Sequence, residues 1–208
     1  MLNKTAPKKM TIVVMFPTCM ESAPFEARVA EGACGSEVCV RICGVGMAES
    51  GAAVAQAVAE LHPDLLILAG VAGSYTEALA FGDTVAVSSE CVADMGRVES
   101  WTELSGERFT PLFQKVYPLT ALPEGLTAVR SNTVNGCGVP YINTTDAEIE
   151  NMEGASFACT ANALGVRCME VRTISNRVGE RFGRAEVEQC AELLAGRLCE
   201  ILNSQKLK

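Results

Sequence analysis

Short aliphatic runs alternate along this chain with longer alanine-rich segments, and this alternation limits the fold more than any other feature of the sequence. An apolar run of about four to eight residues is typical of a buried strand, whereas a longer alanine-rich segment is typical of a helix. The predicted strands are 11–16, 38–43, 65–69, 83–89 and 168–174, and the predicted helices are 47–61, 152–164 and 185–202. Strands separated by helices favour an α/β fold in which helices flank a central mixed sheet as a three-layer sandwich.

The length of 208 residues suits a single domain with a core that needs neither disulfides nor metal ions. We expect a flexible tail over 1–10 and one domain over 11–208. Segment 94–124 carries scattered proline, glycine and charge. We therefore expect a long surface excursion there, either a lid or an interface arm.

Charge and hydropathy exclude several classes of partner. The net charge is −8 and no stripe of lysine or arginine is present, which argues against nucleic acid or an anionic membrane but leaves a small anionic ligand open. No stretch approaches the ~20 apolar residues of a membrane span. The basic segment 1–10 precedes only a short apolar run, too short for a signal peptide. We expect a cytoplasmic protein.

The ten cysteines lie mostly among aliphatic residues, as Cys39 and Cys43 do in VCVRIC. In that setting a reduced cysteine behaves as a small core residue, so we expect free thiols. Cys34, Cys39 and Cys43 lack the tight spacing of a metal pair, and the single histidine, His62, precedes a proline in a predicted turn. We therefore expect no metal site, no cofactor and no histidine-based catalytic triad.

Two glycine segments, 44–46 and 70–73, each follow a predicted buried strand. In open α/β sheets ligands collect at the carboxyl ends of strands, and glycine lets the main chain approach them closely. Neither segment matches a dinucleotide fingerprint or a phosphate-binding P-loop. Each on its own is more typical of a tight strand-to-helix turn.

Two further segments place polar groups at element ends. Glu153 begins an alanine-rich helix, where it either favours the helix dipole or accepts hydrogen bonds from two vicinal ribose hydroxyls, with Met152 as an apolar contact for the sugar. Asn176 follows a strand, where it either ends the strand or uses its amide to bind N7–H and O6 of a 6-oxopurine.

Three segments resemble the nucleoside phosphorylase and nucleosidase family. LAGVAGSYTEALAFGDTVAVSSE (68–90) and NMEGASFACTANALGVRCMEVRTISN (151–176) resemble its glycine-containing strand and its ribose-binding helix with catalytic strand. PTCMESAPF (17–25) resembles the glutamate loop of methylthioadenosine/S-adenosylhomocysteine nucleosidases. The resemblance covers most of the chain outside 97–130. It implies a nucleoside phosphorylase-like fold, cleavage of the N-glycosidic bond of a purine nucleoside, and a homodimer or larger homo-oligomer.

The resemblance also implies roles for individual residues. Glu21 corresponds to the base that deprotonates the attacking water, and Met152 and Glu153 correspond to the ribose contacts. The base and sugar pocket is assigned to three neighbours, Val71, Ala72 and Gly73. Asn176 stands where adenine-specific nucleosidases have an aspartate, which argues against adenosine-type activity because asparagine cannot act as an ordinary general acid.

Within the family, ISNRVGER (174–181) and ADMG (93–96) are similar to futalosine hydrolases of a menaquinone route. Futalosine carries hypoxanthine and a benzoate carboxylate. We expect Arg181 to pair with that carboxylate, with Arg177 and Arg184 as alternatives. Any one of these arginines is equally compatible with a solvated surface side chain.

Two rival functions remain. A phosphorylase would need cations near the glycine segments, where the sequence shows only Arg41, and Glu21 would repel phosphate, so hydrolysis is favoured. A nucleoside-binding module of the same fold would keep Glu153 but would not need Glu21.

Overall fold

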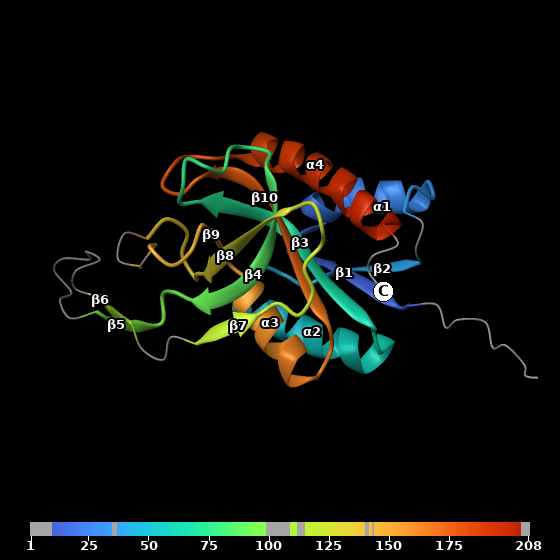
Figure 1. Cartoon of the computed structure of the whole chain (residues 1–208), viewed down its shortest axis with the longest axis horizontal. Helices are drawn as coiled ribbons and strands as arrows, with labels where there is room; N and C mark the ends of the chain where they lie inside the picture. The colour runs from blue at the N-terminus through green and yellow to red at the C-terminus, as the bar shows by residue number, and fades with distance from the viewer. Residues whose placement is uncertain are drawn as a thin grey trace, which may run out of the picture.

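The computed structural model describes residues 10–34, 37–98, 109–111, 115–139, 142 and 144–204. Its central sheet has eight strands: β1 (Ile12–Phe16), β2 (Val38–Ile42), β3 (Leu65–Ser74), β4 (Thr84–Val92), β7 (Val116–Pro118), β8 (Thr127–Thr133), β9 (Ile149–Asn151) and β10 (Cys168–Arg177) (Figure 1). The helices are α1 (Cys19–Ala30), α2 (Met47–Leu61), α3 (Gly154–Ala163) and α4 (Arg184–Asn203). A separate two-stranded sheet joins β5 (Gly96–Val98) to β6 (Phe109–Pro111).

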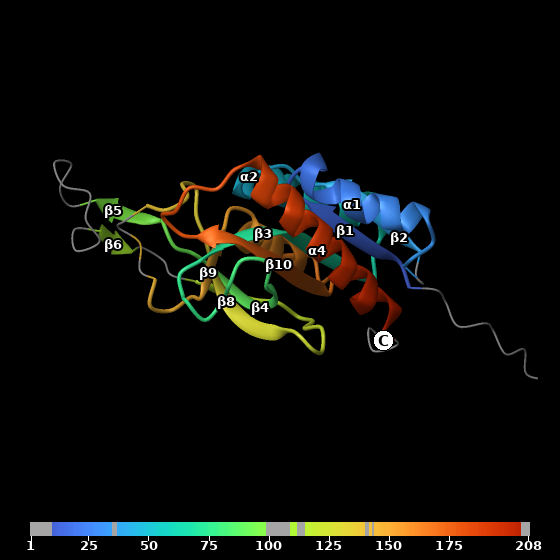
Figure 2. The ribbon, with the colours of Figure 1, turned by 90° about the horizontal axis from the view of Figure 1, so that it is seen from above.

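Helices cover both faces of the sheet, because successive residues of the buried strands point to opposite sides. In β1, Ile12 and Val14 belong to one core cluster and Val13 and Met15 to the other. The first cluster is covered by α1 and α4, and the second by α2 and α3 (Figures 1 and 2). The α/β fold with a mixed sheet between helices is therefore confirmed.

The long strand β3 organises the sheet. Its first half pairs with β1, its whole length runs parallel to β10, and its last two residues pair with β9. β10 continues to β4, β4 to β8, and β8 back to β9, so these pairings close a ring. The carboxyl ends of β3 and β10 and the short strand β9 consequently lie side by side.

Several predicted boundaries are wrong. Residues 70–74 were expected to form a loop. They instead continue strand β3, because they pair with residues of β10. The elements α1, β8 and β9 were not predicted from the sequence. In the predicted excursion 94–124, β7 pairs with β4, while 99–108 and 112–114 lie outside the described residues, as do nine of the ten residues of the predicted tail.

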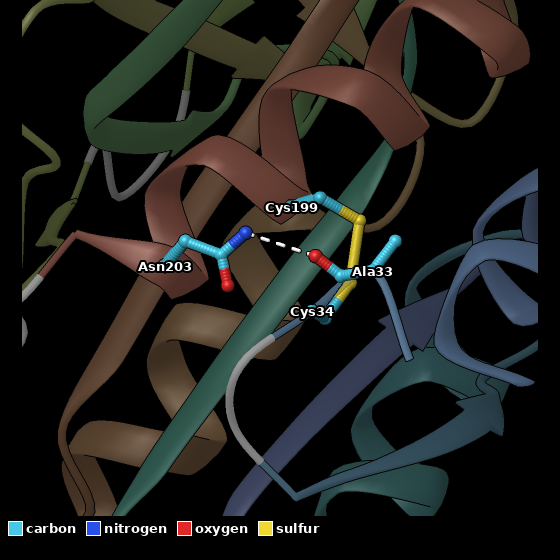
Figure 3. The surroundings of a disulfide bond; sticks show 4 residues. All are labelled: Ala33, Cys34, Cys199 and Asn203. Carbon is cyan, nitrogen blue, oxygen red and sulfur yellow. Dashed lines mark hydrogen bonds between the residues drawn. A yellow bond between two sulfur atoms is a disulfide. The ribbon is translucent and has the colours of Figure 1, made fainter. Parts of the chain in front are cut away.

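The expectation of free thiols is wrong for one pair of cysteines. Cys34, after α1, forms a disulfide with Cys199 of α4, and the two are 165 residues apart in sequence (Figure 3). Asn203 Nδ2 donates a hydrogen bond of 2.9 Å to the Ala33 carbonyl beside it. The other eight cysteines are free. The pair was missed because both residues lie in apolar surroundings that a reduced cysteine would suit equally well.

Within the described part of the chain, the helices are all too short or too polar to cross a membrane.

Candidate active site

A cavity of about 470 Å³ opens where the carboxyl ends of β3 and β10 meet β9 and the first residues of α1 and α3. Its lining is mainly apolar, with a few carboxylate and amide groups, as in many small-molecule sites. Seven of the eight residues predicted for the site line it: Glu21, Val71, Ala72, Gly73, Met152, Glu153 and Asn176. Segments that are distant in the sequence are therefore brought to one place by the sheet topology.

Glu21 is held in the first turn of α1 by its own helix cap. Thr18 accepts a hydrogen bond from the Glu21 N–H and donates one of 2.7 Å to Glu21 Oε2. The other carboxylate oxygen accepts a 3.0 Å bond from the Val71 N–H. The side chain is only 4% exposed, and burial raises the pKa of Glu21 above its ordinary value, against the opposing effect of these hydrogen bonds. A buried carboxylate with a raised pKa is suited to accept a proton.

Glu153 occupies the N-cap position of α3 but makes no side-chain cap bond to its own helix. Oε1 accepts a 3.1 Å hydrogen bond from the N–H of Gly46, the residue that precedes α2. Gly46 has a φ of 90°, a conformation that glycine adopts without strain. The first glycine segment is therefore a strand-to-helix turn, and its Gly46 N–H also binds the Glu153 carboxylate.

Arg172 is a buried residue of the site that was not predicted from the sequence. Its side chain is 1% exposed on β10 and lies 3.3 Å from Glu153 Oε2. The statement that Arg41 is the only cation near the glycine segments is therefore wrong, since Arg172 also contacts the Val71 carbonyl. Two charged residues within one predicted buried strand, Glu170 and Arg172, were the available signal, because buried charged residues require partners.

Gly70 explains how these groups fit together. A Cβ atom on Gly70 would lie 2.7 Å from Arg172 Nη1 and 2.9 Å from Glu21 Oε1. Only glycine lets the two charged side chains approach the backbone of β3 at this point. The second glycine segment thus acts as a flat stretch of strand beneath the cavity rather than as a turn.

Asn176 lies at the far end of the cavity beside β3. Its Oδ1 accepts a 2.8 Å hydrogen bond from Ser175 Oγ, and its Nδ2 donates one of 2.8 Å to the Arg177 carbonyl. An amide has a further N–H and a further lone pair, so one donor and one acceptor are left over. Across Gly73, Glu150 of β9 also lines the cavity, with both oxygens occupied by the Tyr75 hydroxyl and the Gly138 N–H.

Arg181 does not line the same cavity as Glu21. It lines an adjacent hollow of about 400 Å³, which shares Asn176 with the main cavity. Of the three arginines considered for the substrate carboxylate, Arg184 lines the main cavity, and its Nε lies 2.7 Å from Glu188 Oε1. Arg177 is paired with Glu77 instead.

The part of the chain that the structure describes holds no group of three or more His, Cys, Asp or Glu side chains suited to a metal ion. What the cavity does offer is a buried carboxylate base, a second carboxylate fixed by a guanidinium, and an amide beside a flat strand. Such a set can orient a sugar, activate a water molecule and hydrogen-bond a heterocyclic base.

Known proteins resemble this chain in sequence and in fold. The model of the phosphorylase superfamily matches residues 20–136 and 129–204. The futalosine hydrolase of Thermus thermophilus is 29% identical over 179 residues, covering 78% of this chain and 79% of that protein.

Two Helicobacter pylori structures share the fold. The 5′-methylthioadenosine/S-adenosylhomocysteine nucleosidase has a TM-score of 0.76 at 16% identity, covering 94% of this chain and 98% of that one. The futalosine hydrolase has a TM-score of 0.75 at 16% identity, covering 95% and 99%.

Proposed function

The chain belongs to the phosphorylase superfamily, and from that premise we propose that it is a nucleosidase that hydrolyses the N-glycosidic bond of a purine nucleoside. The observation that carries the proposal is the convergence of Glu21 and Glu153 on one cavity, each buried and each fixed by hydrogen bonds. A module that only binds nucleosides has no need of Glu21 as a buried base.

Glu153 holds the ribose in the proposed reaction. Gly46 and Arg172 fix its carboxylate, which accepts hydrogen bonds from the 2′- and 3′-hydroxyls. Met152 lines the cavity next to it and supplies an apolar contact for the sugar. With the sugar fixed, C1′ is presented to the water molecule activated by Glu21, and the C1′–N9 bond lengthens toward an oxocarbenium-like state.

Asn176 binds the leaving base. Its remaining acceptor faces N7–H and its remaining donor faces O6 of a 6-oxopurine such as hypoxanthine, so that charge developing on the base is stabilised. The strand segment Val71–Gly73 lines the cavity beside it. A flat backbone without large side chains suits a planar purine.

Water is favoured over phosphate as the nucleophile. Arg172 is the buried cation of the site, but all five of its N–H groups have protein acceptors. Glu21 and Glu153 line the cavity where the nucleophile would bind, and negative charge on these side chains opposes the binding of a phosphate dianion. The geometry therefore supports hydrolysis rather than phosphorolysis.

Futalosine is the substrate that we propose in particular, with hypoxanthine and dehypoxanthine futalosine as products in menaquinone biosynthesis. Support comes from the similarity to the Thermus thermophilus enzyme, from Asn176, and from the rim of the cavity. Val45 and Phe182 form an exposed apolar part of that rim, with Arg184 nearby. An apolar surface beside a cation suits an aromatic carboxylate. Assembly into a homodimer or larger homo-oligomer and a cytoplasmic location stay predictions.

The test is product analysis of the purified protein with futalosine, inosine and methylthioadenosine, each with and without phosphate. We expect hypoxanthine from futalosine at a rate independent of phosphate. Phosphate-dependent formation of ribose 1-phosphate would instead show a phosphorylase. Adenine from methylthioadenosine at a higher rate would show a methylthioadenosine-type nucleosidase. Binding without turnover of any substrate would show a binding module.

A further inference from the structure

A cluster of buried polar groups lies next to Glu153 and extends from the cavity lining into the core. Glu90 of β4 and Glu170 of β10 are 1% and 0% exposed, and neither has a part in the proposed chemistry. Asn151 of β9 and Thr133 of β8 complete the cluster. Burying two carboxyl groups in a protein core is costly unless both are well paired, so their presence requires an explanation.

The cluster reaches the ribose site through Arg172 and Asn151. Arg172 Nε donates a 2.8 Å hydrogen bond to Glu170 Oε1, while Nη1 and Nη2 lie 3.3 Å from Glu153 Oε2. Asn151 Oδ1 accepts bonds of 2.8 and 2.7 Å from the N–H groups of Glu153 and Gly154, and one of 3.1 Å from Arg172 Nη2. Whatever fixes the Asn151 side chain therefore fixes both Glu153 and Arg172.

Glu90 fixes Asn151. Asn151 Nδ2 donates a 2.6 Å hydrogen bond to Glu90 Oε1, and Thr133 Oγ1 donates one of 2.7 Å to Glu90 Oε2. Thr133 in turn accepts a 2.7 Å bond from the N–H of Ala155 in the first turn of α3. A Cβ atom on Gly154 would collide with Glu90 Oε1, so the helix begins directly against this carboxyl group.

The charges of the cluster do not balance if all three carboxyl groups ionise. Glu153 and Glu170 each form an ion pair with Arg172, but Glu90 makes no direct ion pair with it. A third buried negative charge beside one guanidinium would be uncompensated. The proton that neutralises the excess charge therefore belongs on Glu90.

We propose that Glu90 is a positioning residue, a buried carboxylic acid that stays neutral and orients Asn151, and through it Glu153 and Arg172, beneath the ribose site. The inference rests on the proposed function for its catalytic consequence. The electrostatic surroundings agree with it, because burial and the neighbouring charge of Glu170 raise the pKa of Glu90 well above its ordinary value. Besides Glu170, the described titratable and charged groups around Glu90 include Arg172, Tyr75 and Cys91, and Arg130 and Asp146 line the same hollow as Glu90.

The direction of the pH effect follows from this assignment. The neutral form of Glu90 is the functional one, so activity declines as pH rises through its raised pKa. Ionisation of Glu90 would place its negative charge next to that of Glu170 and would draw Arg172 away from Glu153. In Glu90→Gln the side chain stays neutral at every pH, and its amide can still accept from Asn151. That variant should lose the alkaline decline while keeping its activity at neutral pH.

The experiment compares Glu90→Gln, Glu90→Ala and the control Glu148→Gln. Glu148 pairs with exposed Arg130 on the same sheet, and its pKa is lowered, so it is ionised at neutral pH. We expect kcat/KM of Glu90→Gln and of the control within about threefold of the parent, and that of Glu90→Ala reduced by about thirtyfold or more, a loss of about 2 kcal/mol. Rescue by glutamine but not alanine, with removal of the alkaline limb, is a result that loss of packing alone would not give.

Infrared spectroscopy tests the protonation state without any substrate. The parent protein at neutral pH should show the carbonyl stretch of a carboxylic acid, absent in Glu90→Gln and retained in Glu148→Gln. If the parent cleaves no nucleoside, the proposed function fails, yet this band still decides whether Glu90 is neutral, and calorimetric binding of a nucleoside to the three variants replaces the kinetics. The inference is overturned if the band is missing, or if Glu90→Gln is as impaired as Glu90→Ala.

Discussion

At the scale of single residues, the catalytic assignment depends on how the two carboxylates are held. Glu21 is bound by a hydroxyl and a main-chain N–H, and Glu153 by a main-chain N–H and a guanidinium. The guanidinium of Arg172 fixes the Glu153 carboxylate in place beside the cavity. Burial raises the pKa of Glu21 although its hydrogen bonds oppose that effect, and a more basic carboxylate suits a group that takes up a proton.

Replacing Glu21 by glutamine should lower kcat by about 10²–10⁴-fold with little change in nucleoside binding, since general-base catalysis contributes that much. In the parent, kcat/KM should fall on the acidic side through a pKa above that of an ordinary glutamate, because Glu21 must be ionised to act and its pKa is raised. Steady-state kinetics against pH, with calorimetric binding of a nucleoside to both proteins, measure these effects. Unchanged turnover in the variant would show that Glu21 is not the base.

Replacing Asn176 by aspartate should shift the preference between purines. A carboxyl group that carries a proton can protonate an adenine-type leaving group, whereas the amide pairs with N7–H and O6 of hypoxanthine. We expect kcat/KM for a hypoxanthine nucleoside to fall about tenfold or more while release of adenine from methylthioadenosine rises. Chromatography of the two products measures the ratio. A ratio equal to that of the parent would contradict the role of Asn176 in base selection.

Arg181 and Arg184 give alternative positions for the cation that binds a substrate carboxylate. Arg184 lines the main cavity and Arg181 the adjacent hollow, so the structure favours Arg184 over the residue chosen from the sequence. Arg184→Gln should raise KM for futalosine about tenfold or more, with KM for inosine unchanged because inosine lacks the carboxylate. Arg181→Gln is the matched control. The opposite pattern would restore the original prediction.

At the scale of elements, the pairing of β3 with β10 brings the site residues together. Some of these elements can be predicted from the sequence and others cannot. The strand cores and α2 follow from apolar runs, and the residue types at their ends indicate Glu153 and Asn176. The helix α1 was missed because Pro24 interrupts its pattern, although Thr18 and Glu21 have the spacing of a capping box. Arg172 was missed because its partners other than Glu170 come from other elements, and single-sequence patterns do not reveal such contacts.

The strand β10 carries two arginines that make a matched pair for a stability test. Arg172 is buried between two glutamates, whereas Arg177 is 39% exposed and pairs with the exposed Glu77. Arg172→Leu should lower the free energy of unfolding by about 3–5 kcal/mol, because it leaves buried carboxylates without a partner. Arg177→Leu should cost less than about 1 kcal/mol. Urea denaturation measures both, and equal effects would contradict the account of the buried network.

At the scale of the whole molecule, the two faces of the sheet are tied together differently. The face covered by α2 and α3 is held by side-chain packing. The face covered by α1 and α4 carries in addition the Cys34–Cys199 disulfide, which joins the segment after α1 to the last helix (Figure 3). The disulfide thus connects the segment that follows α1, the helix that carries Glu21, to the last helix α4, and both cysteines belong to the core on this face of the sheet.

A disulfide that closes so long a loop should stabilise the fold substantially. For a separation of 165 residues, the reduction in unfolded-state entropy corresponds to about 5 kcal/mol. The double variant Cys34→Ser/Cys199→Ser should therefore melt about 10–20 °C below the parent without reductant. Reductant should lower Tm of the parent alone, and thiol titration in denaturant should give eight free thiols in the parent, in agreement with its eight free cysteines. Ten thiols in protein purified without reductant would contradict the disulfide, and the original expectation of free cysteines would then hold for the whole chain.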